Sequence, residues 1–456
     1  MAASRKTFKV GRVRLYLRGR MWYLCYYEGG RRKRYRAHTD RTTARRMAAE
    51  LNAQIETGAP TSFSFERVSL VELRKRWLNH HENVKRSSLH TIRRYRSATD
   101  HLIKFVNGAS CGSDVSKLGP ADAEQFLAHL RSTLVAPNGH ANTPKRRLLD
   151  KGILFIAETC RTLFGYAATH RHLPPYAKNP FSEINVCSMQ VDETKPVRVL
   201  TAEEEKKVLD ACDEYLFPVM LTMMMTGLRP AELTHLLLPQ DLDLERGVLR
   251  VINKPRLSWT VKTKAEREVP LAPELVEVLK QTVAHRAPGL AFPRRVRATG
   301  TILTTPEAME ATLQRRITES EQLLARVSTR QERAALARRV WREAGLMTNE
   351  QLRREFIRVT KKAGIIDITT PKTMRHGFAT MLQEANVDPV VRMQLMGHAP
   401  TYAVNRALGM TAWYTHTRPE TMREQLLAAL AGRPTMAAAV AFLHDRAARQ
   451  ADSEHR

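Results

Sequence analysis

The chain has 456 residues, of which 43% are hydrophobic and 26% are charged, and this composition excludes a collagen, a disordered chain and a low-complexity chain. The length favours roughly two to four domains and can bury a sizeable core. Lys and Arg number 74 against 46 Asp and Glu, which gives a formal net charge of +28. These positive charges repel one another unless a polyanion neutralises them, and nucleic acid is the commonest polyanionic partner.

The longest nearly apolar run, residues 215–228, contains 14 residues, whereas a membrane span needs about 20. We therefore predict a core helix there and no membrane association. The N-terminal residues lack the apolar stretch of a signal peptide. The five cysteines are scattered without a CxxC pair, which predicts reduced thiols, no disulfide framework and no zinc site. The expected location is the cytoplasm, in association with the nucleoid.

Residues 1–50 contain 15 Lys and Arg against three acidic residues. Alternating apolar residues, with turns at Gly19 and Gly29–Gly30, predict a three-stranded antiparallel sheet over residues 13–36. Thr42 or Thr43 is predicted to cap a helix that ends near residue 56. A small sheet with many arginines and exposed aromatic rings can enter a DNA groove, although a solvated basic hairpin without specific contacts is the alternative. We predict a DNA-binding domain at residues 1–58, with candidate contacts at Arg14, Arg20, Arg31, Arg32, Lys33 and Arg34.

Residues 66–175 have a helical pattern and form the second predicted domain. Ser88 is expected to cap a helix whose apolar face includes Ile92 and Leu102. The opposite face is basic, and a basic helical domain can follow DNA phosphates, whereas ordinary solvated surface is the simpler interpretation. The candidate DNA contacts are Arg93, Arg94 and Arg96.

A third domain is predicted at residues 196–430, after a proline-containing linker. Thr201 and Glu204 form the pattern of a capping box, which begins a helix. A strand pair is expected at residues 247–252 and 259–270. Residues 297–348 predict a helical insertion or hairpin, either a protein-contact element or an exposed decoration. Residues 431–456 are expected to form a helical tail.

Two segments carry candidate chemistry in the first half of this third domain. Residues 226–233 read TGLRPAEL, so an apolar helix ends at a glycine and Arg229 opens the next helix, where it could bind a phosphate, while Glu232 is expected to anchor the loop. Residues 261–271 read VKTKAEREVPL, which predicts a turn between two strands with Lys262 beside it. A lysine over a phosphodiester can protonate the departing oxygen, although a solvated hairpin lysine is the simpler interpretation.

Three further segments follow. In residues 372–381, KTMRHGFATM, Lys372 and Arg375 are three apart and share one helical face. Residues 395–398 read LMGH and close a helix for which Asp388 is the expected N-cap. Residues 413–416 read WYTH.

These five segments, in this order, resemble the motifs of the tyrosine recombinase (phage integrase) family, whose strings look like TGLR-x-x-E-L, TKT followed by VPL, H-x-L-R-H-x-F-A-T, LGH and Y-T-H. The resemblance is strong over about residues 196–420, and the two upstream domains look more loosely like the family's arm-binding sheet and helical core-binding domain. It implies a multidomain fold that is mainly α with small β-sheets (α+β), arranged as a clamp around DNA.

The resemblance also implies the chemistry. A tyrosine attacks a DNA phosphorus and forms a 3′-phosphotyrosine, with no metal, no ATP and no other cofactor, because fixed cations stabilise the phosphorane. Carried over position by position, Arg229 and Arg375 would hold the phosphate and Lys262 would be the general acid. His398 would hydrogen-bond the phosphate and Tyr414 would be the nucleophile. His376, Trp413 and His416 are expected to be supporting residues.

Two positions depart from the family pattern. Lys372 stands where the family usually has histidine; it can donate to a phosphate oxygen but is a poor base unless its pKa is lowered. His398 and Tyr414 are sixteen residues apart, a longer spacing than is usual in the family, so Tyr402 is a rival nucleophile. Lys264 is likewise the alternative to Lys262.

The implied function is site-specific strand exchange that integrates or excises a mobile element. The implied partners are double-stranded DNA at core and arm sites, a homotetramer on that DNA, and an accessory DNA-bending or directionality protein. In this family the C-terminal tail commonly docks on a neighbouring subunit, and packing on its own subunit is the alternative. Two other functions stay open: a DNA-binding regulator that lost the chemistry, and a type IB topoisomerase-like enzyme.

Overall fold

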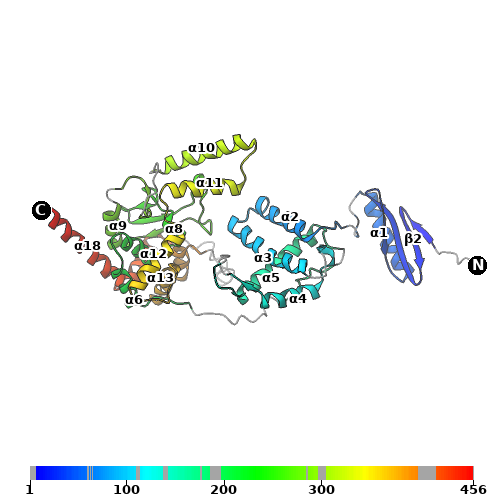
Figure 1. Ribbon diagram of the computed structural model, residues 1–456, viewed down its shortest axis with the longest axis horizontal. Helices are drawn as coiled ribbons and strands as arrows, with labels where there is room; N and C mark the ends of the chain where they lie inside the picture. Colours follow the sequence, from blue (N-terminus) through cyan, green and yellow to red (C-terminus); the bar gives the residue numbers. More distant parts are fainter. Residues whose placement is uncertain are drawn as a thin grey trace, which may run out of the picture. The chain divides into compact units, whose positions relative to one another are not determined.

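The structure is a computed structural model that describes residues 7–58, 61, 63, 65–108, 113–136, 142–174, 177–184, 197–283, 286–295, 305–398 and 417–454 (Figure 1). The chain divides into two compact units, residues 1–195 and 196–456. Helices predominate in both units, and the sheets are small. This is the mainly helical fold with small sheets that the sequence predicted.

The N-terminal sheet has four strands, β1 (Thr7–Val10), β2 (Val13–Arg18), β3 (Met21–Glu28) and β4 (Arg31–Arg36), in that order and all antiparallel. The prediction of three strands was therefore wrong by one, because β1 has only four residues and gives only a short alternation signal. Helix α1 (Arg41–Glu56) is capped by Asp40, which accepts a hydrogen bond from the backbone amide of Thr43, so neither predicted threonine is the cap.

One face of this sheet packs on α1. Val13, Leu15 and Leu24 are fully buried there against Ala44 and Ala48. Trp22 and Tyr26 are also buried on this face, so these two aromatic rings are not exposed as the sequence analysis expected. Within the described residues, no helix or strand packs on the other face, which we call the open face.

The rest of the first unit is helical, with α2 (Leu70–Asn83), α3 (Leu89–Gly108), the 3-10 helix η1 (Val115–Lys117), α4 (Pro120–Ser132), the short strands β5 (Leu134–Val135) and β6 (Arg146–Arg147), and α5 (Asp150–Thr169). Trp77, Phe126 and Phe164 are buried at its centre. Helix α3 buries Ile92 and Leu102 as predicted.

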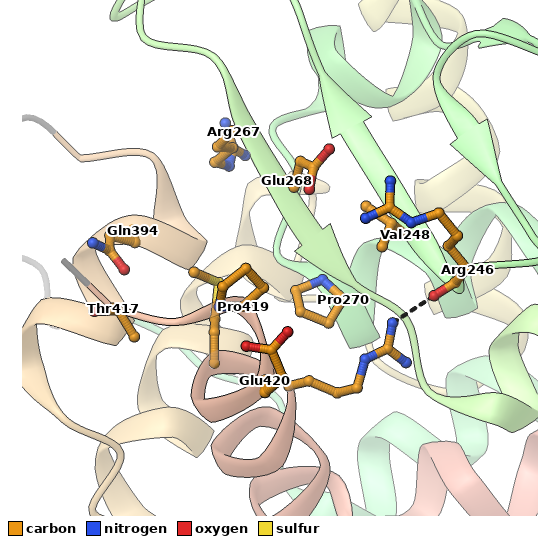
Figure 2. A pocket seen from close by; sticks show the side chains of 11 residues that line it. Arg246, Val248, Arg267, Glu268, Pro270, Gln394, Thr417, Pro419 and Glu420 are labelled. Atoms are coloured by element: carbon orange, nitrogen blue, oxygen red, sulfur yellow. Dashed lines mark hydrogen bonds between the residues drawn. The ribbon is translucent and has the colours of Figure 1, made fainter.

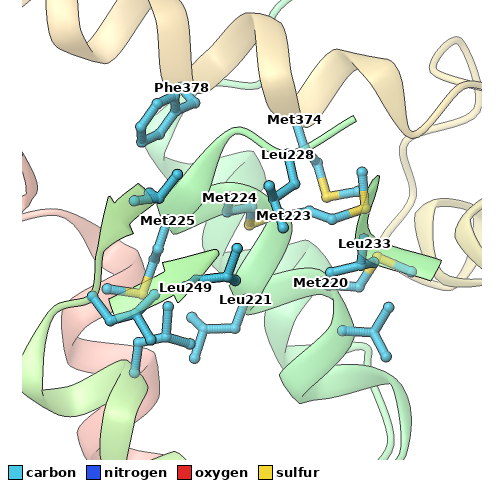
Figure 3. Close-up of a cluster of buried hydrophobic side chains, with 14 of the residues drawn as sticks. Met220, Leu221, Met223, Met224, Met225, Leu228, Leu233, Leu249, Met374 and Phe378 are labelled. Carbon is cyan, nitrogen blue, oxygen red and sulfur yellow. The ribbon is translucent and has the colours of Figure 1, made fainter. Parts of the chain in front are cut away.

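The second unit is built around α7 (Leu216–Thr226), in which every residue is buried (Figure 3). Helix α6 (Ala202–Asp210) precedes it and begins with the predicted capping box of Thr201 and Glu204. Helices α8 (Pro230–Thr234), α9 (Pro273–Val283), α12 (Asn349–Lys362), α13 (Lys372–Glu384), α14 (Pro389–Met396) and α17 (Pro419–Leu430) complete the described helical core. Methionines of α7 contact Met374 and Phe378 of α13, which fixes α13 against the end of α7.

A three-stranded sheet, in the order β10–β9–β8, lies in this unit, with β8 (Leu242–Asp243), β9 (Val248–Val251) and β10 (Arg267–Pro270) all antiparallel. A separate two-stranded ladder joins β7 (Leu237–Leu238) to β11 (Gly289–Leu290). The predicted strand at 259–270 is therefore much shorter. A single bridge between Trp259 and Lys254 and a turn at residues 261–264 take the place of its first half, and the 3-10 helix η3 (Pro255–Leu257) precedes it.

The predicted helical insertion is a hairpin of α10 (Pro306–Leu324) and α11 (Arg330–Glu343). Its inner face is buried with residues of β7, η3 and β11 in one hydrophobic cluster. The hairpin is therefore anchored to the second unit, not an exposed decoration.

The C-terminal helix α18 (Pro434–Glu454) packs on its own unit. Phe442 stacks on Phe217 of α7 with ring centroids 4.3 Å apart, and Arg433 forms a 2.8 Å ion pair with Glu205 of α6. The tail therefore contacts its own unit, and its docking on a neighbouring subunit stays a prediction.

Among the described residues, no single helix is long and apolar enough to cross a membrane, and α17 with residues 434–449 meets the length and composition criteria only as a pair bent by 85°. The described cysteines Cys25, Cys160 and Cys212 are free thiols.

Candidate active site

The site begins at the end of α7, where Gly227 adopts φ +60° and turns the chain into α8. A Cβ atom at this position would lie 2.2 Å from Cδ1 of Phe378, so only glycine fits without displacement. Arg229 follows as the N-cap of α8, with Pro230 as the first helical residue. This turn brings Arg229 back toward α13.

Glu232 holds Arg229 in place, as the sequence analysis expected. Its carboxylate accepts a 2.9 Å hydrogen bond from the backbone amide of Arg229 and pairs with the Arg229 guanidinium at 2.6 Å. The same carboxylate pairs at 2.7 Å with Arg267 of β10. Burial acts to raise the pKa of Glu232, but the pairs with Arg267 and Arg229 outweigh it and hold that pKa below its ordinary value.

Arg267 was not among the predicted site residues. Its side chain is 6% exposed and also donates a 3.0 Å hydrogen bond to the carbonyl of Leu395 on α14. The sequence signal was available but weak: Arg267 is a basic residue at the start of a strand that is otherwise buried at Val269. Since the partner Glu232 lies 35 residues away, only the tertiary structure reveals the pair.

Arg375 is the most deeply buried cation of the group, with 4% exposure. It donates a 2.6 Å hydrogen bond to the carbonyl of Gly227, and a second to the carbonyl of Met396. Burial, followed by repulsion from Arg229, lowers the pKa of Arg375 to about 10, so the guanidinium stays charged at neutral pH. Arg375 therefore joins the α7–α8 turn to the end of α14.

His398 lies at that end of α14 with Nε2 3.2 Å from the Arg375 guanidinium. A guanidinium can only donate, so Nε2 accepts this hydrogen bond and Nδ1 carries the proton of the neutral ring. Burial, then the charges of Arg375 and Arg229, lower the pKa of His398, which favours this neutral form. Arg229, in turn, donates a 3.2 Å hydrogen bond to the carbonyl of the adjacent Gly397.

Three predicted residues, Arg229, Arg375 and His398, thus come together from segments up to 169 positions apart in the sequence. Two guanidiniums and a neutral imidazole around one spot are well suited to the oxygens of a phosphodiester, because the forked donors of arginine match phosphate geometry.

The predicted lysines are exposed. Lys262 lies in the turn before β10, and Lys264 ends this turn with φ +59°. Lys372 is the first residue of α13, one helical turn before Arg375. Among the contacts of the described residues, none joins Lys262 or Lys372 to the arginines. The predicted Tyr414 and its rival Tyr402 lie outside the described residues, as do Trp413 and His416.

A cavity of about 320 Å³ lies beside Arg267, between β10, α14 and α17 (Figure 2). Glu268, Gln394 and Thr417 line it. Arg423 of α17 closes one side by donating hydrogen bonds of 2.6 and 2.9 Å to the carbonyls of Arg246 and Gly247. In the described part of the chain, no three His, Cys, Asp or Glu side chains converge as metal ligands do.

The open face of the N-terminal sheet is basic and aromatic. Strand register pairs Arg14 with Cys25 and Cys25 with Arg34, and Tyr16 with Tyr23 and Tyr23 with Arg36. Because side chains alternate between faces, these residues share one face with those at every second register position. The open face consists of Thr7, Lys9, Arg14, Tyr16, Arg18, Met21, Tyr23, Cys25, Tyr27, Arg32, Arg34 and Arg36.

Only three of the six predicted contacts of this sheet, Arg14, Arg32 and Arg34, lie on that face. Lys33 pairs with the buried Tyr26 and belongs to the α1 side, while Arg20 and Arg31 lie at the turns. Period-two alternation would have found Arg18 and Arg36, which sequence reasoning missed.

The predicted contacts of the helical part, Arg93, Arg94 and Arg96, are all exposed on α3. The guanidinium of Arg94 lies 3.9 Å from the ring centroid of Phe155 on α5, so this side chain is partly held by a cation–π contact.

Comparisons with known proteins place these features in a family. A curated relative, the tyrosine recombinase XerC of Thermodesulfovibrio yellowstonii, is 25% identical over 350 residues, which cover 75% of this chain and 90% of that protein. The transposase of transposon Tn916 from Enterococcus faecalis is 28% identical over 189 residues, 38% of this chain and 41% of that protein.

Among solved structures, the Tn1549 transposon integrase in complex with transposon right-end DNA matches 80% of this chain and 100% of that chain, with a TM-score of 0.50 and 19% identity. This likeness concerns the fold. Residues 198–421 match the description of the phage integrase family. This match covers the five motifs and the arginine cluster. The chain therefore belongs to the phage integrase family, the tyrosine recombinases.

Proposed function

We propose that the chain is a site-specific DNA recombinase that cleaves and rejoins DNA through a 3′-phosphotyrosine. The observation that carries the proposal is the convergence of Arg229, Arg375 and His398, which is supported by hydrogen bonds to three carbonyls at Gly227, Met396 and Gly397. A buried cluster of cations that is held in place by these hydrogen bonds is suited to bind an anion. In the tyrosine recombinase family this anion is a phosphodiester of DNA.

In the proposed reaction, the phenolic proton of Tyr414 passes to solvent, because neighbouring cations favour the phenolate. The phenolate oxygen attacks phosphorus, the bond from phosphorus to the 5′ oxygen breaks, and Lys262 gives a proton to that oxygen. Arg229 and Arg375 stabilise the negative charge on the non-bridging oxygens. His398, neutral with its proton on Nδ1, donates a hydrogen bond to the phosphate. Lys372 donates to a phosphate oxygen and does not act as the base. The phosphotyrosine conserves the bond energy, so a second 5′-hydroxyl can rejoin the strand without a cofactor.

The two DNA-binding regions fit this proposal. The open face of the N-terminal sheet has the alternating arginine and tyrosine side chains of a β-ribbon that lies in a groove at an arm site. The exposed arginines of α3 suit contacts to the phosphates of a core site.

Strand exchange between two duplexes requires cleavage of four strands, so four copies are proposed to assemble on DNA. We further propose that the reaction integrates or excises a mobile element in the cytoplasm, at the nucleoid. The curated transposase and the solved transposon integrase support this choice among recombinases. An accessory DNA-bending or directionality protein is part of the proposal.

Trapping of the covalent intermediate tests the proposal. Wild-type protein, Tyr414→Phe and Tyr402→Phe are incubated with DNA that carries the element's ends and a nick beside the cleavage position, and the products are run on a denaturing gel. The proposal predicts an adduct that only Tyr414→Phe abolishes. Tight DNA binding without any adduct would instead favour the regulator, and relaxation of supercoiled DNA without a specific site would favour the topoisomerase-like enzyme.

A further inference from the structure

The insertion hairpin contacts η3, which precedes the turn that carries Lys262, and Trp341 of α11 lies at this contact. Trp341 is 3% exposed, and its indole Nε1 donates a 3.1 Å hydrogen bond to the carbonyl of Leu257 in η3. Leu257, itself buried, belongs to the same hydrophobic cluster as Met309 and Leu313 of α10. The hairpin therefore holds η3, the segment immediately before the Lys262 turn, by both apolar contact and a hydrogen bond.

Trp341 also closes a stack of rings. Its ring lies edge-on to His235, with centroids 4.7 Å apart, and His235 stacks on Trp259 at 5.0 Å. His235 is the C-cap of α8, the helix that begins with Arg229. Three rings from three separate segments thus connect the insertion, the arginine helix and the loop before Lys262 (residues 252–260).

Trp259 in turn fixes the loop. Its backbone exchanges two hydrogen bonds with Lys254, at 2.9 and 3.1 Å, and the Lys254 ammonium lies 4.9 Å from its ring centroid. Lys254 is anchored from behind by a buried 2.8 Å ion pair with Asp241. The indole of Trp259, three residues before Lys262, therefore contacts both Lys254 and His235.

Asn253 completes the support. Its side chain accepts a 2.9 Å hydrogen bond from the Val261 amide and donates one of 3.1 Å to the Lys264 carbonyl. These two bonds bracket Lys262 on both sides. The turn itself therefore has a fixed shape. It is attached to the rest of the unit through the buried Val261 and through β10, and on the side of the insertion through Trp259 and η3.

We propose that Trp341 is a positioning residue for the general acid: the insertion hairpin holds the Lys262 turn at the scissile phosphate through the stack of Trp341, His235 and Trp259. The inference rests on the proposed function, because it assigns a task only if Lys262 protonates the leaving oxygen. In this proposal, the contact between the insertion hairpin and η3 contributes to catalysis as well as to folding.

The test uses the chemistry of the leaving group. In normal DNA the departing 5′ oxygen needs a proton, whereas a sulfur atom at the same bridging position leaves as a thiolate, since thiols have pKa values near 8.5. Loss of general-acid catalysis therefore slows cleavage of normal DNA and spares cleavage of the sulfur-bridged DNA. A loss of folding or of phosphate binding slows both.

The variants are Trp341→Leu, which removes the aromatic ring, and the milder Trp341→Phe, which keeps one aromatic ring but removes the Nε1 donor and part of the indole. Lys262→Ala is the benchmark, and Leu323→Ser, at an exposed position on the same hairpin, is the control. We expect Trp341→Leu to cleave normal DNA about 10- to 100-fold more slowly and sulfur-bridged DNA at nearly the wild-type rate. Trp341→Phe should show the same pattern with a smaller loss, and Leu323→Ser should match wild type on both.

An equal loss on both DNAs in Trp341→Leu and Trp341→Phe would overturn the inference and leave the hairpin a purely structural role. Unchanged cleavage of normal DNA would overturn it as well. If wild-type protein cleaved neither DNA, the proposed function itself would fail. If wild type cleaved both and Lys262→Ala lacked the sulfur rescue, the assignment of Lys262 would be wrong and the inference would fall with it.

Discussion

Arg267 and Glu232 form a 2.7 Å ion pair in which the side chains are only 6% and 2% exposed. Both carboxylate oxygens of Glu232 also accept hydrogen bonds from Arg229, one from its backbone amide and one from its guanidinium. A single glutamate therefore sets the position of a proposed phosphate ligand and is itself held by Arg267 of β10. Removing one partner of a buried pair leaves an uncompensated charge.

We therefore predict that Glu232→Ala lowers the free energy of unfolding by about 3–5 kcal/mol. The control is Asp210→Ala, which removes the exposed 2.6 Å pair with Lys206 and should cost less than about 1 kcal/mol. Urea denaturation followed by tryptophan fluorescence measures both. Equal costs for the two variants would contradict the view that the Glu232 pair is an interior anchor.

The stability of the second unit should depend on His235 in a defined pH window. Burial lowers the pKa of His235 from 6.5 to about 4, so the unfolded chain binds its proton more readily than the folded chain. The stability that the neutral ring contributes is present above pH 6.5 and is lost progressively as the pH falls toward 4. The free energy of unfolding that is lost over this pH range is at most about 3 kcal/mol.

His235→Phe keeps an aromatic ring between Trp259 and Trp341 and removes the titration. Urea midpoints measured from about pH 4 to pH 7 should therefore fall less steeply with decreasing pH in the variant than in wild type. Parallel pH curves would show that His235 does not titrate differently in the folded state.

The turn at Gly227 should tolerate no side chain. In Gly227→Ala, the new Cβ would collide with Phe378, and the positive φ would add strain, so we expect a loss of about 2–4 kcal/mol. Because the Gly227 carbonyl is a partner of Arg375, DNA cleavage should fall as well.

The matched control is Gly432→Ala, where φ is +72° and no atom lies within 4 Å of the place that the new Cβ would occupy, so it tests the backbone strain alone. We expect it to cost about 1 kcal/mol. Thermal unfolding of the two variants separates the collision from the strain, and similar costs would exclude the Phe378 contact as the cause.

On the N-terminal sheet, neighbouring residues provide an internal comparison. Arg34 lies on the open face and Lys33 on the α1 side, so Arg34→Ala should weaken binding of an arm-site duplex and Lys33→Ala should not. If Arg34 contacts one phosphate, the slope of log K against log salt should become less steep by about one. Equal effects of the two substitutions would indicate nonspecific attraction to the whole domain.

Much of this architecture was predictable from local patterns. The capping box at Thr201, the buried helix around Met223 and the insertion hairpin follow from periodicity and caps, which are properties of consecutive residues. The motif positions Arg229, Arg375 and His398 followed from the resemblance to the family. Their mutual contacts, however, depend on how α8, α13 and α14 pack.

What sequence reasoning missed has physical reasons. Residues 259–266 alternate like a strand, but Trp259 stacks on His235 and forms only a single bridge with Lys254, and the chain then turns at residues 261–264. Arg267 looked like a surface strand residue because its partner Glu232 is distant in sequence. Lys33 was grouped with Arg32 and Arg34 because charge alone does not tell the two faces of a sheet apart, and its contact with DNA stays a prediction.

The central claim is that the cluster of Arg229, Arg375 and His398 holds the phosphate that Tyr414 attacks. The most direct measurement is mass spectrometry of the proteolysed DNA–protein adduct, which identifies the residue bonded to the 3′-phosphate. Our account predicts that the nucleotide is attached to the peptide that contains Tyr414. Attachment to Tyr402, or to any other residue, would contradict it.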